Sequence, residues 1–357
     1  MTANELTIVK STNLKSKPEK DQIPFGSTFT DHMFVMDYAE DKGWHEPRIV
    51  PYEPVTLDPA AMIFHYGQTV FEGLKAYRAD GDRILMFRPE KNLERLNRSS
   101  DRLSIPPIDE DEVMSHLEEL IRIEKDWVPA TDGTSLYIRP FIIATDPNLA
   151  VAPSKTYKFM IILSPVGSYF SGGIHPVKIK VENEFTRAVK GGTGMAKTAG
   201  NYSSAYQAQS NAYKEGSADV LWLDGIEKRY IEEVGSMNIF FKINGEVVTP
   251  ALSGSILKGI TRMSILELLR DWEVPVVERK ISIDELYEAY ERGEVEEAFG
   301  TGTAAVISPV GELNWQGKKM TINNHEIGEL SQKLYDTITG IQKGNVEDPY
   351  DWVVEVK

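Results

Sequence analysis

Alternation of apolar and polar residues predicts strands in both halves of the chain. Residues 135–144 and 177–181 alternate with a period of two, and 84–87 and 219–225 contain short continuous apolar runs. A period of two places successive side chains on opposite faces of a strand, whereas a short apolar run is typical of a buried strand. Asn-Gly at 244–245 separates two further apolar runs and predicts a hairpin.

Apolar residues spaced three or four apart predict amphipathic helices between these strands. In one case Pro89 opens a helix over 90–103, in which Leu93, Leu96 and Leu103 form the buried stripe. Proline is tolerated at a helix start because the first N–H groups have no partner within the helix. Further helices are predicted over 109–127, where Asp109 and Glu112 resemble a capping box, and over 201–215, 260–272 and 326–342.

The length of the chain predicts two domains. Its 357 residues exceed the usual size of one core, and 41% hydrophobic residues suffice for two. We expect the interdomain linker over 171–176, a glycine-containing stretch between two strands. Residues 1–24 are polar with scattered lysines and prolines, which predicts an arm that is disordered or laid over a neighbour.

Charge and composition narrow the class of partner. The formal net charge of -15 disfavours nucleic acid and anionic membranes, because the long-range field repels polyanions. Zero cysteines exclude disulfides and thiolate chemistry, and the six histidines show no metal-binding spacing. No apolar run approaches the length of a membrane span, and residues 1–20 lack the apolar core of a secretory signal. We therefore expect a cytoplasmic protein without a metal site.

A glycine-rich loop over 191–202 holds a single lysine, Lys197. Its small neighbours allow the amine to be enclosed and partly dehydrated, which makes a lysine a usable nucleophile for Schiff-base chemistry. Two alternatives stay open. The lysine could be solvated in a flexible connector, or the loop could be a nucleotide phosphate loop, since 191–198 differs from G-x-x-x-x-G-K-[ST] only in having Ala196 at the second glycine. The phosphate loop is disfavoured because 182–190 is too polar for the buried parallel strand that must precede it.

Two later stretches carry polar groups in unusual surroundings. Strand alternation places Ile231, Glu233 and Gly235 on one face, and a carboxylate on an apolar face needs a partner. The glycine-rich turn 254–259 leads directly into the helix that begins at Ile260. The first N–H groups of a helix form a ready anion site.

An arginine and a tyrosine share one face of strand 135–144. The period of two puts Tyr137 and Arg139 opposite Leu136 and Ile138. Arg139 could bind a carboxylate or could simply face water, and both interpretations stay open.

Lys197, Glu233 and the helix start at Gly259 offer what pyridoxal phosphate needs: a lysine, an acid opposite the pyridine nitrogen and a phosphate cradle. With these residues the chain resembles the branched-chain amino-acid aminotransferases of the class IV pyridoxal-phosphate fold. The matching motifs lie at 25–33, 66–76, 92–95, 137–140 and 167–170. The resemblance implies a two-domain α+β fold, with a small N-terminal α/β domain over 1–170 and a larger, β-rich cofactor-binding domain over 177–357. It also implies a homodimer whose site lies between the domains.

The resemblance further implies a role for each site residue. Lys197 would form the Schiff base and move the proton between two carbons, Tyr202 would hydrogen-bond the phenolic oxygen of the ring, and Glu233 would pair with the pyridinium. The phosphate would be held by Arg95, Gly259, Ile260, Thr261 and Thr303. The substrate carboxylate would be received by Ser236 and Ala304. The side-chain pocket would be lined by Phe25, Tyr66, Phe71, Tyr137, Arg139, Tyr169 and, from a neighbouring subunit, Val151.

We therefore expect reversible transfer of an amino group between leucine, isoleucine or valine and 2-oxoglutarate. D-amino-acid aminotransferase and aminodeoxychorismate lyase share the lysine and the glutamate, but the stretches 71–75 and 137–139 favour the branched-chain enzyme. Ala305 and Ser308 stand where mammalian members carry C-x-x-C, so thiol regulation is not expected. The preferred branched-chain substrate, and a role in synthesis or breakdown, stay open.

Overall fold

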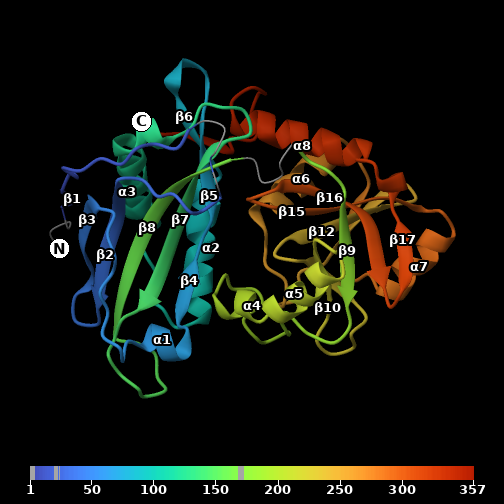
Figure 1. The fold of residues 1–357 in the computed structure, drawn as a ribbon, viewed down its shortest axis with the longest axis horizontal. Helices are drawn as coiled ribbons and strands as arrows, with labels where there is room; N and C mark the ends of the chain where they lie inside the picture. The colour runs from blue at the N-terminus through green and yellow to red at the C-terminus, as the bar shows by residue number, and fades with distance from the viewer. Residues whose placement is uncertain (1–4, 20–22, 24, 168–172) are drawn as a thin grey trace. The chain divides into compact units, whose positions relative to one another are not determined.

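The computed structural model describes residues 5–19, 23, 25–167 and 173–357. The chain divides into two compact units, each built around a nine-stranded sheet (Figure 1). Both units combine helices with strands, which confirms the expected α+β class. Unit 1 comprises 1–169, 196–199 and 340–357, and unit 2 comprises 170–195 and 200–339.

Unit 1 is organised around a sheet with the strand order β1-β3-β2-β8-β7-β5-β6-β18, with β4 paired to β7 outside that order. Among the described strands of this sheet, every neighbouring pair is antiparallel except β1 with β3. The strands are β1 (Thr7–Ile8), β2 (His32–Ala39), β3 (Gly43–Pro51), β4 (Thr69–Phe71), β5 (Leu74–Arg78), β6 (Ile84–Phe87), β7 (Ser135–Ala144), β8 (Thr156–Val166) and β18 (Val353–Glu355). The helices are α1 (Met62–Tyr66), α2 (Pro89–Arg102) and α3 (Glu110–Ile123), with 3₁₀ turns at Asp80–Asp82 and Lys125–Trp127.

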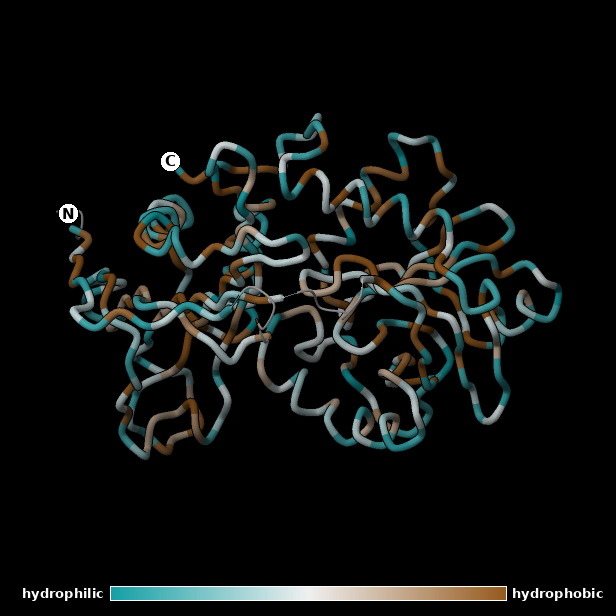
Figure 2. Tube along the Cα trace, turned by 45° about the horizontal axis from the view of Figure 1, so that its top comes forward, coloured by the Kyte–Doolittle hydropathy of each residue, from teal (hydrophilic) through white to brown (hydrophobic). Residues whose placement is uncertain are grey.

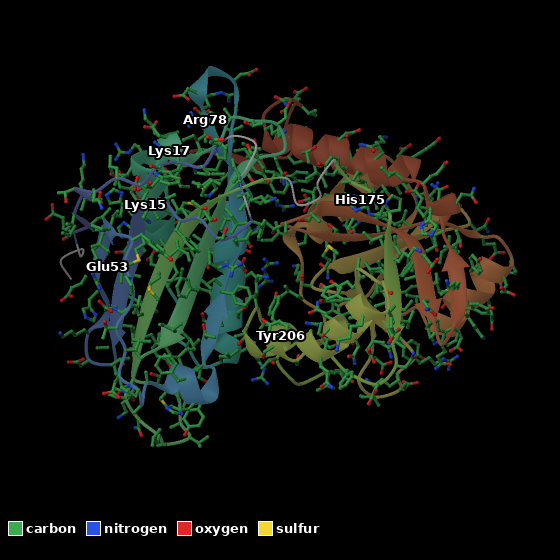
Figure 3. The ribbon with its side chains drawn as sticks, in the orientation of Figure 1. Lys15, Lys17, Glu53, Arg78, His175 and Tyr206 are labelled. Carbon is green, nitrogen blue, oxygen red and sulfur yellow. The ribbon has the colours of Figure 1, made fainter. Side chains whose placement is uncertain are left out.

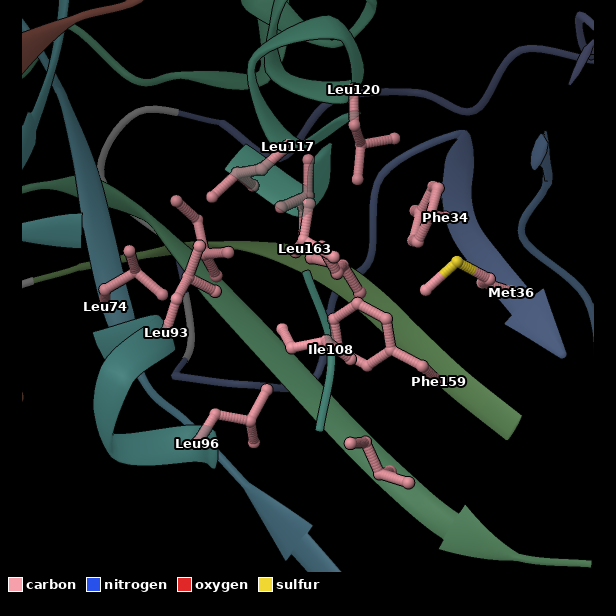
Figure 4. Close-up of a cluster of buried hydrophobic side chains, with 14 of the residues drawn as sticks. Phe34, Met36, Leu74, Leu93, Leu96, Ile108, Leu117, Leu120, Phe159 and Leu163 are labelled. Carbon is pink, nitrogen blue, oxygen red and sulfur yellow. The ribbon is translucent and has the colours of Figure 1, made fainter. Parts of the chain in front are cut away.

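A hydrophobic core joins this sheet to α2 and α3 (Figure 4). Leu74 of β5 belongs to the same cluster as Leu93 and Leu96 of α2 and Leu117 and Leu120 of α3, and all five are at most 2% exposed. The buried stripe predicted for α2 is thus confirmed at Leu93 and Leu96, whereas Leu103 is the C-cap residue after the helix and is only partly buried. Burial of each such side chain stabilises the unit by roughly 1.5–3 kcal/mol, so this core fixes α2 against the sheet.

Both ends of the described chain pack onto unit 1. The N-terminal arm, expected to be disordered or laid over a neighbour, adds β1 to β3. Lys15 of this arm, labelled in Figure 3, also donates its backbone N–H to Asp31 Oδ1 at 2.7 Å. At the other end β18 pairs with β6, so 340–357 belong to unit 1 and not, as the sequence suggested, to a domain over 177–357. Strand pairing between segments far apart in sequence determines where the N-terminal arm and residues 340–357 lie, and local composition does not predict such pairing.

Unit 2 is built on a mixed sheet with the order β11-β10-β9-β16-β15-β12-β13-β14, and β17 pairs with β16. Neighbours run parallel in β9–β10, β9–β16 and β13–β14. The strands are β9 (Val177–Glu182), β10 (Asp219–Leu223), β11 (Ile231–Val234), β12 (Asn238–Ile243), β13 (Glu246–Pro250), β14 (Val276–Arg279), β15 (Val295–Gly302), β16 (Val306–Trp315) and β17 (Lys318–Thr321). The helices are α4 (Gly200–Ser203), α5 (Tyr206–Lys214), α6 (Ile260–Asp271), α7 (Ile283–Glu291) and α8 (Glu329–Gln342), with a 3₁₀ turn at Asn323–His325. Figure 2 shows teal, hydrophilic residues prevailing at many of the outer loops.

The predicted hairpin is confirmed and one predicted helix is divided. Asn244 and Gly245 both adopt positive φ between β12 and β13, as a two-residue turn of this kind requires. The helix expected over 201–215 is interrupted between α4 and α5. There the hydroxyls of Ser203 and Ser204 hydrogen-bond to backbone carbonyls one turn earlier, and such bonds compete with regular helix geometry.

None of the helices among the described residues has the length and apolar character that crossing a membrane requires. No cluster of three or more histidine, aspartate or glutamate side chains in the described parts of the chain could hold a metal ion.

Candidate active site

Lys197 lies on a short segment that adds to the edge strand β4 in unit 1. Val70 and Thr198 form an isolated antiparallel bridge, and the Phe71 N–H donates to the Lys197 carbonyl at 3.0 Å. The Lys197 N–H donates to Ser99 Oγ on α2 at 2.9 Å, and Thr198 Oγ1 donates to the Thr69 carbonyl at 2.7 Å. These bonds hold the backbone of the lysine on both sides, so the loop is not the flexible connector considered above.

The amine of Lys197 lies beside an aromatic ring and a buried ion pair. Its Nζ is 4.9 Å from the centroid of the Phe71 ring. Next to Phe71, the fully buried carboxylate of Glu72 receives hydrogen bonds from Arg95 Nε at 2.7 Å, from Arg95 Nη2 at 2.9 Å and from Asn92 Nδ2 at 2.7 Å. Burial alone would raise the pKa of Glu72, but Arg95, with Lys197 and Asn92, holds that pKa below its usual value.

A second cluster of site residues lies on β7 and next to it. Tyr137 and Arg139 share a face, as predicted, and Arg139 Nη2 donates to the Tyr137 hydroxyl at 3.2 Å. The Arg139 guanidinium lies 4.9 Å from the centroid of the Phe71 ring, and Phe25 meets the Tyr137 ring edge-on. Arg139 is half-buried with Nε shielded from solvent, so it is not an arginine that simply faces water.

Gly73 explains why Tyr137 can occupy this position. A Cβ atom at Gly73 would lie 2.0 Å from the Tyr137 hydroxyl oxygen, a distance that no side chain tolerates. Glycine is therefore required here because the tyrosine packs directly over the backbone.

Sequence reasoning missed Lys75 as a member of this group. Lys75 on β5 is directly opposite Tyr137 on β7 in the antiparallel pair, so both side chains leave the same face of the sheet. Burial lowers the pKa of Lys75 to about 8. Its position in the motif 71–75 was visible in the sequence, but the pairing of β5 with β7 was not.

The remaining unit 1 residues of the expected pocket are more exposed. Tyr66 is 42% exposed, and its hydroxyl donates to the Leu149 carbonyl. Val151, expected to act in a neighbouring subunit, is 89% exposed. Tyr169 lies outside the described residues.

In unit 2, Glu233 is buried on β11. One carboxylate oxygen, Oε1, accepts from the Leu257 N–H at 2.7 Å and lies 3.4 Å from Arg187 Nη2. The sequence pattern required a partner for this carboxylate, and the structure supplies Leu257 and Arg187, neither of which is near Glu233 in sequence.

The residues predicted to bind an anion lie at the start of α6. Gly259 is the N-cap residue with extended backbone, and Ile260 and Thr261 begin the helix. A Cβ atom at Gly259 would lie 2.1 Å from Asn238 Oδ1, while Asn238 Nδ2 donates to the Leu257 carbonyl at 2.9 Å. Asn238, which the sequence analysis did not single out, therefore fixes the approach to the cradle.

Two turns of unit 2 bring three more predicted residues to one end of the sheet. Ser236 lies in the tight turn between β11 and β12, and Thr303 and Ala304 lie between β15 and β16. Because Asn238 pairs with Thr301, these turns are neighbours at the same end of the β12–β15 pair. Tyr202 is half-buried on α4.

The lysine loop lacks the context of a nucleotide phosphate loop. The parallel strand β9 ends at Glu182, well before the glycines at 191–192, and the helix after Lys197 is the short α4. Gly194 is instead needed for contact within the protein, since a Cβ there would lie 2.1 Å from the Ser255 carbonyl oxygen.

Comparison with known proteins identifies the family of the chain. The sequence model of the family described as "Amino-transferase class IV" matches residues 69–313. The chain is 65% identical to branched-chain-amino-acid aminotransferase 2 of Bacillus subtilis, over 100% of this chain and 98% of that protein. It is 56% identical to a probable branched-chain-amino-acid aminotransferase of Staphylococcus aureus, over 96% of each chain.

Solved structures show the same fold. The crystal structure of the Escherichia coli branched-chain amino acid aminotransferase superposes with a TM-score of 0.76 at 26% identity, covering 92% of this chain and 99% of that one. The enzyme of Thermoproteus uzoniensis, crystallised with norvaline, superposes with a TM-score of 0.76 at 27% identity, covering 91% and 100%. Family match, full-length relatives and shared fold lead to one conclusion: the chain belongs to the class IV aminotransferases and, within them, to the branched-chain-amino-acid aminotransferases.

Proposed function

We propose that the residues described above perform this family's reaction, reversible transfer of an amino group between leucine, isoleucine or valine and 2-oxoglutarate, with pyridoxal phosphate as cofactor. The observation that carries the proposal is the anchoring of Lys197: backbone bonds to β4 and Ser99 fix its position while its amine lies against Phe71. A reactive lysine needs a fixed backbone, because its long side chain is itself flexible and further backbone motion would misplace the amine.

The described residues fit pyridoxal phosphate in chemical kind. Unit 2 offers a helix N-terminus for a phosphate dianion and a buried carboxylate for a pyridinium, and unit 1 offers the lysine. When bound, the cofactor supplies an electron sink for the bond electrons released when the substrate Cα–H bond breaks.

Each residue then has a definite task. With the cofactor bound, Lys197 would move the proton of the substrate Cα, and Glu233 would keep the ring nitrogen protonated. Tyr202 would donate to the phenolic oxygen. The phosphate would be held by the N–H groups of Ile260 and Thr261, by the hydroxyl of Thr303 and by Arg95, whose orientation Glu72 fixes. The substrate carboxylate would be received by Ser236 and the N–H of Ala304.

The substrate side chain meets aromatic and cationic groups. Phe25, Tyr66, Phe71 and Tyr169 suit an aliphatic side chain, and Tyr137 with Arg139 suits the distal carboxylate of 2-oxoglutarate. An arginine fork matches a carboxylate in geometry as well as charge. The pocket can therefore accept both partners of the exchange.

We also propose a homodimer. Exposed apolar side chains gather on α1 and the 145–155 loop: Phe64, Tyr66, Leu149 and Val151 are 62%, 42%, 64% and 89% exposed. Large exposed apolar side chains near one another are typical of protein interfaces. Val151→Asp should shift the mass in size-exclusion chromatography from that of a dimer to that of a monomer. A wild-type protein that elutes as a monomer would contradict the proposal.

We also propose a cytoplasmic location, which cell fractionation tests.

A Lys197→Ala variant tests the function directly. Wild type mixed with pyridoxal phosphate should show a visible absorption band that borohydride bleaches, and it should transfer amino groups from all three branched-chain amino acids to 2-oxoglutarate. The variant should lose the band and the activity while still binding the phosphate group. A variant with near wild-type turnover would overturn the proposal.

A further inference from the structure

Two adjacent glutamates of β11 are buried, and only one of them has a role in the proposed reaction. Glu232 is 6% exposed and Glu233 is 3% exposed. Both carboxylates hydrogen-bond to the same short stretch of chain, residues 253–257, which leads into the start of α6. Burying a second acid is costly, so Glu232 calls for an explanation.

Glu232 holds this stretch through a serine. Its Oε1 accepts a short hydrogen bond from Ser255 Oγ, which lies 2.9 Å from Ser253 Oγ. Its Oε2 is buried, and no described residue hydrogen-bonds to it. Burial raises the pKa of Glu232, an effect that Ser255 and Arg187 oppose. The carboxyl is thus retained at an energetic cost, which indicates a positional role.

The same serine is held from its other side by Arg187. Arg187 Nη2 donates to the Ser255 carbonyl and lies 3.4 Å from Glu233 Oε1. Two residues later, Leu257 donates its N–H to Glu233. Four side chains, those of Glu232, Arg187, Glu233 and Asn238, therefore fix the main chain just before the cradle.

Packing leaves part of this stretch unsupported. A cavity of about 370 Å³ within unit 2 lies beside it, lined by Ser253, Ser255 and Ile256 from the stretch and by Tyr230, Glu232 and Lys280 from its surroundings. Side chains next to a cavity lose packing contacts on that side. Ser255 and Ile256 are nevertheless buried, at 1% and 4% exposed, so the hydrogen bonds add to a restraint that packing supplies only on the side away from the cavity.

We propose that Glu232 is a positioning residue for the phosphate end of the cofactor site. Through Ser255 it fixes the segment that enters α6, and so the direction of the Ile260 and Thr261 N–H groups. The inference rests on the cradle role proposed above for these two residues. Removal of Glu232 should weaken binding of the phosphate group and leave binding of the pyridine ring nearly unchanged.

The test compares two ligands that differ only in the phosphate. Holoenzyme is prepared, the cofactor is removed by dialysis, and the dissociation constants of pyridoxal phosphate and of pyridoxal are measured by absorption titration. Glu232→Leu and Ser255→Ala should each weaken pyridoxal phosphate about tenfold, as loss of one hydrogen bond to a charged group predicts, and pyridoxal less than about twofold. The double variant should also lose about tenfold rather than a hundredfold, because the two residues act as one unit.

Two further variants separate positioning from general stability. Glu232→Gln keeps an acceptor for Ser255 and should restore the affinity for pyridoxal phosphate to within about threefold of wild type. Glu297→Leu removes another buried acid of unit 2, one that accepts from the Leu330 and Ser331 N–H groups, and should lower thermal stability without changing the ratio of the two dissociation constants.

The outcomes are distinct. Equal weakening of both ligands would mean that Glu232 acts through Glu233 on the ring, and no weakening would mean that it supports the fold alone; either result overturns the inference. A wild type that shows no preference for pyridoxal phosphate over pyridoxal would instead refute the proposed cradle. If Glu232→Leu does not fold, Ser255→Ala and Glu232→Gln still decide the question.

Discussion

Glu72 and Arg95 form a two-point ion pair in the interior of unit 1. Arg95 Nε and Nη2 lie 2.7 and 2.9 Å from the two carboxylate oxygens, and both residues are at most 5% exposed. The pair joins the residue after β4 to α2, and its carboxylate lies within the electrostatic influence of Lys197. It therefore connects the stability of unit 1 with the orientation of an arginine that we assign to the cofactor phosphate.

Replacing Glu72 should destabilise the protein strongly. Glu72→Leu leaves a buried guanidinium without its carboxylate, which should lower the free energy of unfolding by about 3–5 kcal/mol. Glu94→Leu is the matched control, because Glu94 pairs with Lys91 on the surface of the same helix and its loss should cost less than about 1 kcal/mol. Urea unfolding measures both, and similar losses for the two variants would contradict the assignment.

Glu233→Gln should separate chemistry from folding. The amide can still accept from the Leu257 N–H, but it cannot favour a protonated ring nitrogen, so kcat should fall on the order of a hundredfold. Steady-state kinetics on cofactor-saturated enzyme, with the unfolding temperature as control, checks this. An unstable variant with normal activity per folded molecule would show that Glu233 is only structural.

Arg139→Met should discriminate between the two substrates. Arg139 is held by Tyr137 beside Phe71, where it suits the distal carboxylate of glutamate and 2-oxoglutarate. KM for 2-oxoglutarate should rise by a factor that corresponds to about 1.5–3 kcal/mol, with a smaller effect on leucine. An equal rise in KM for both substrates would mean that Arg139 only supports the pocket wall. An unchanged KM for both would mean that Arg139 does not contact the substrate.

Lys75 should make stability depend on pH in the alkaline range. Its pKa is about 8 in the folded protein, below the value near 10.4 of an unfolded chain. Between these values the unfolded chain binds more protons, so this group makes stability rise with pH from about 8 to about 10.4, by on the order of 3 kcal/mol. Below pH 8 both states are protonated and the contribution is constant.

Lys75→Met removes this dependence. Urea unfolding at several pH values between 7 and 10 should show that the advantage of the variant over wild type shrinks as the pH rises. Lys91→Met on the surface of α2 serves as the control and should give no such slope. If the difference in free energy of unfolding between wild type and Lys75→Met stays constant with pH, the low pKa of Lys75 is contradicted.

The sequence by itself determined the local elements and the chemical kind of the site. Strand 135–144, the Asn244–Gly245 hairpin and the leucine stripe of α2 follow from periodicity and turn chemistry, which act over a few residues. The order of Lys197, Glu233 and the α6 start also indicated the family, since each of these motifs is a contiguous stretch of the sequence.

The tertiary structure alone decided which residues meet. Lys75 comes to lie opposite Tyr137, and β18 beside β6, through strand pairing between distant segments. Arg187 reaches Glu233 and Ser255, and Glu232 reaches Ser255, across loops whose course no local pattern reveals. Periodicity predicts the face of the element on which a side chain lies. Its contact partner depends on long-range strand pairing and burial, and that partner determines the protonation and the rigidity of the site residue.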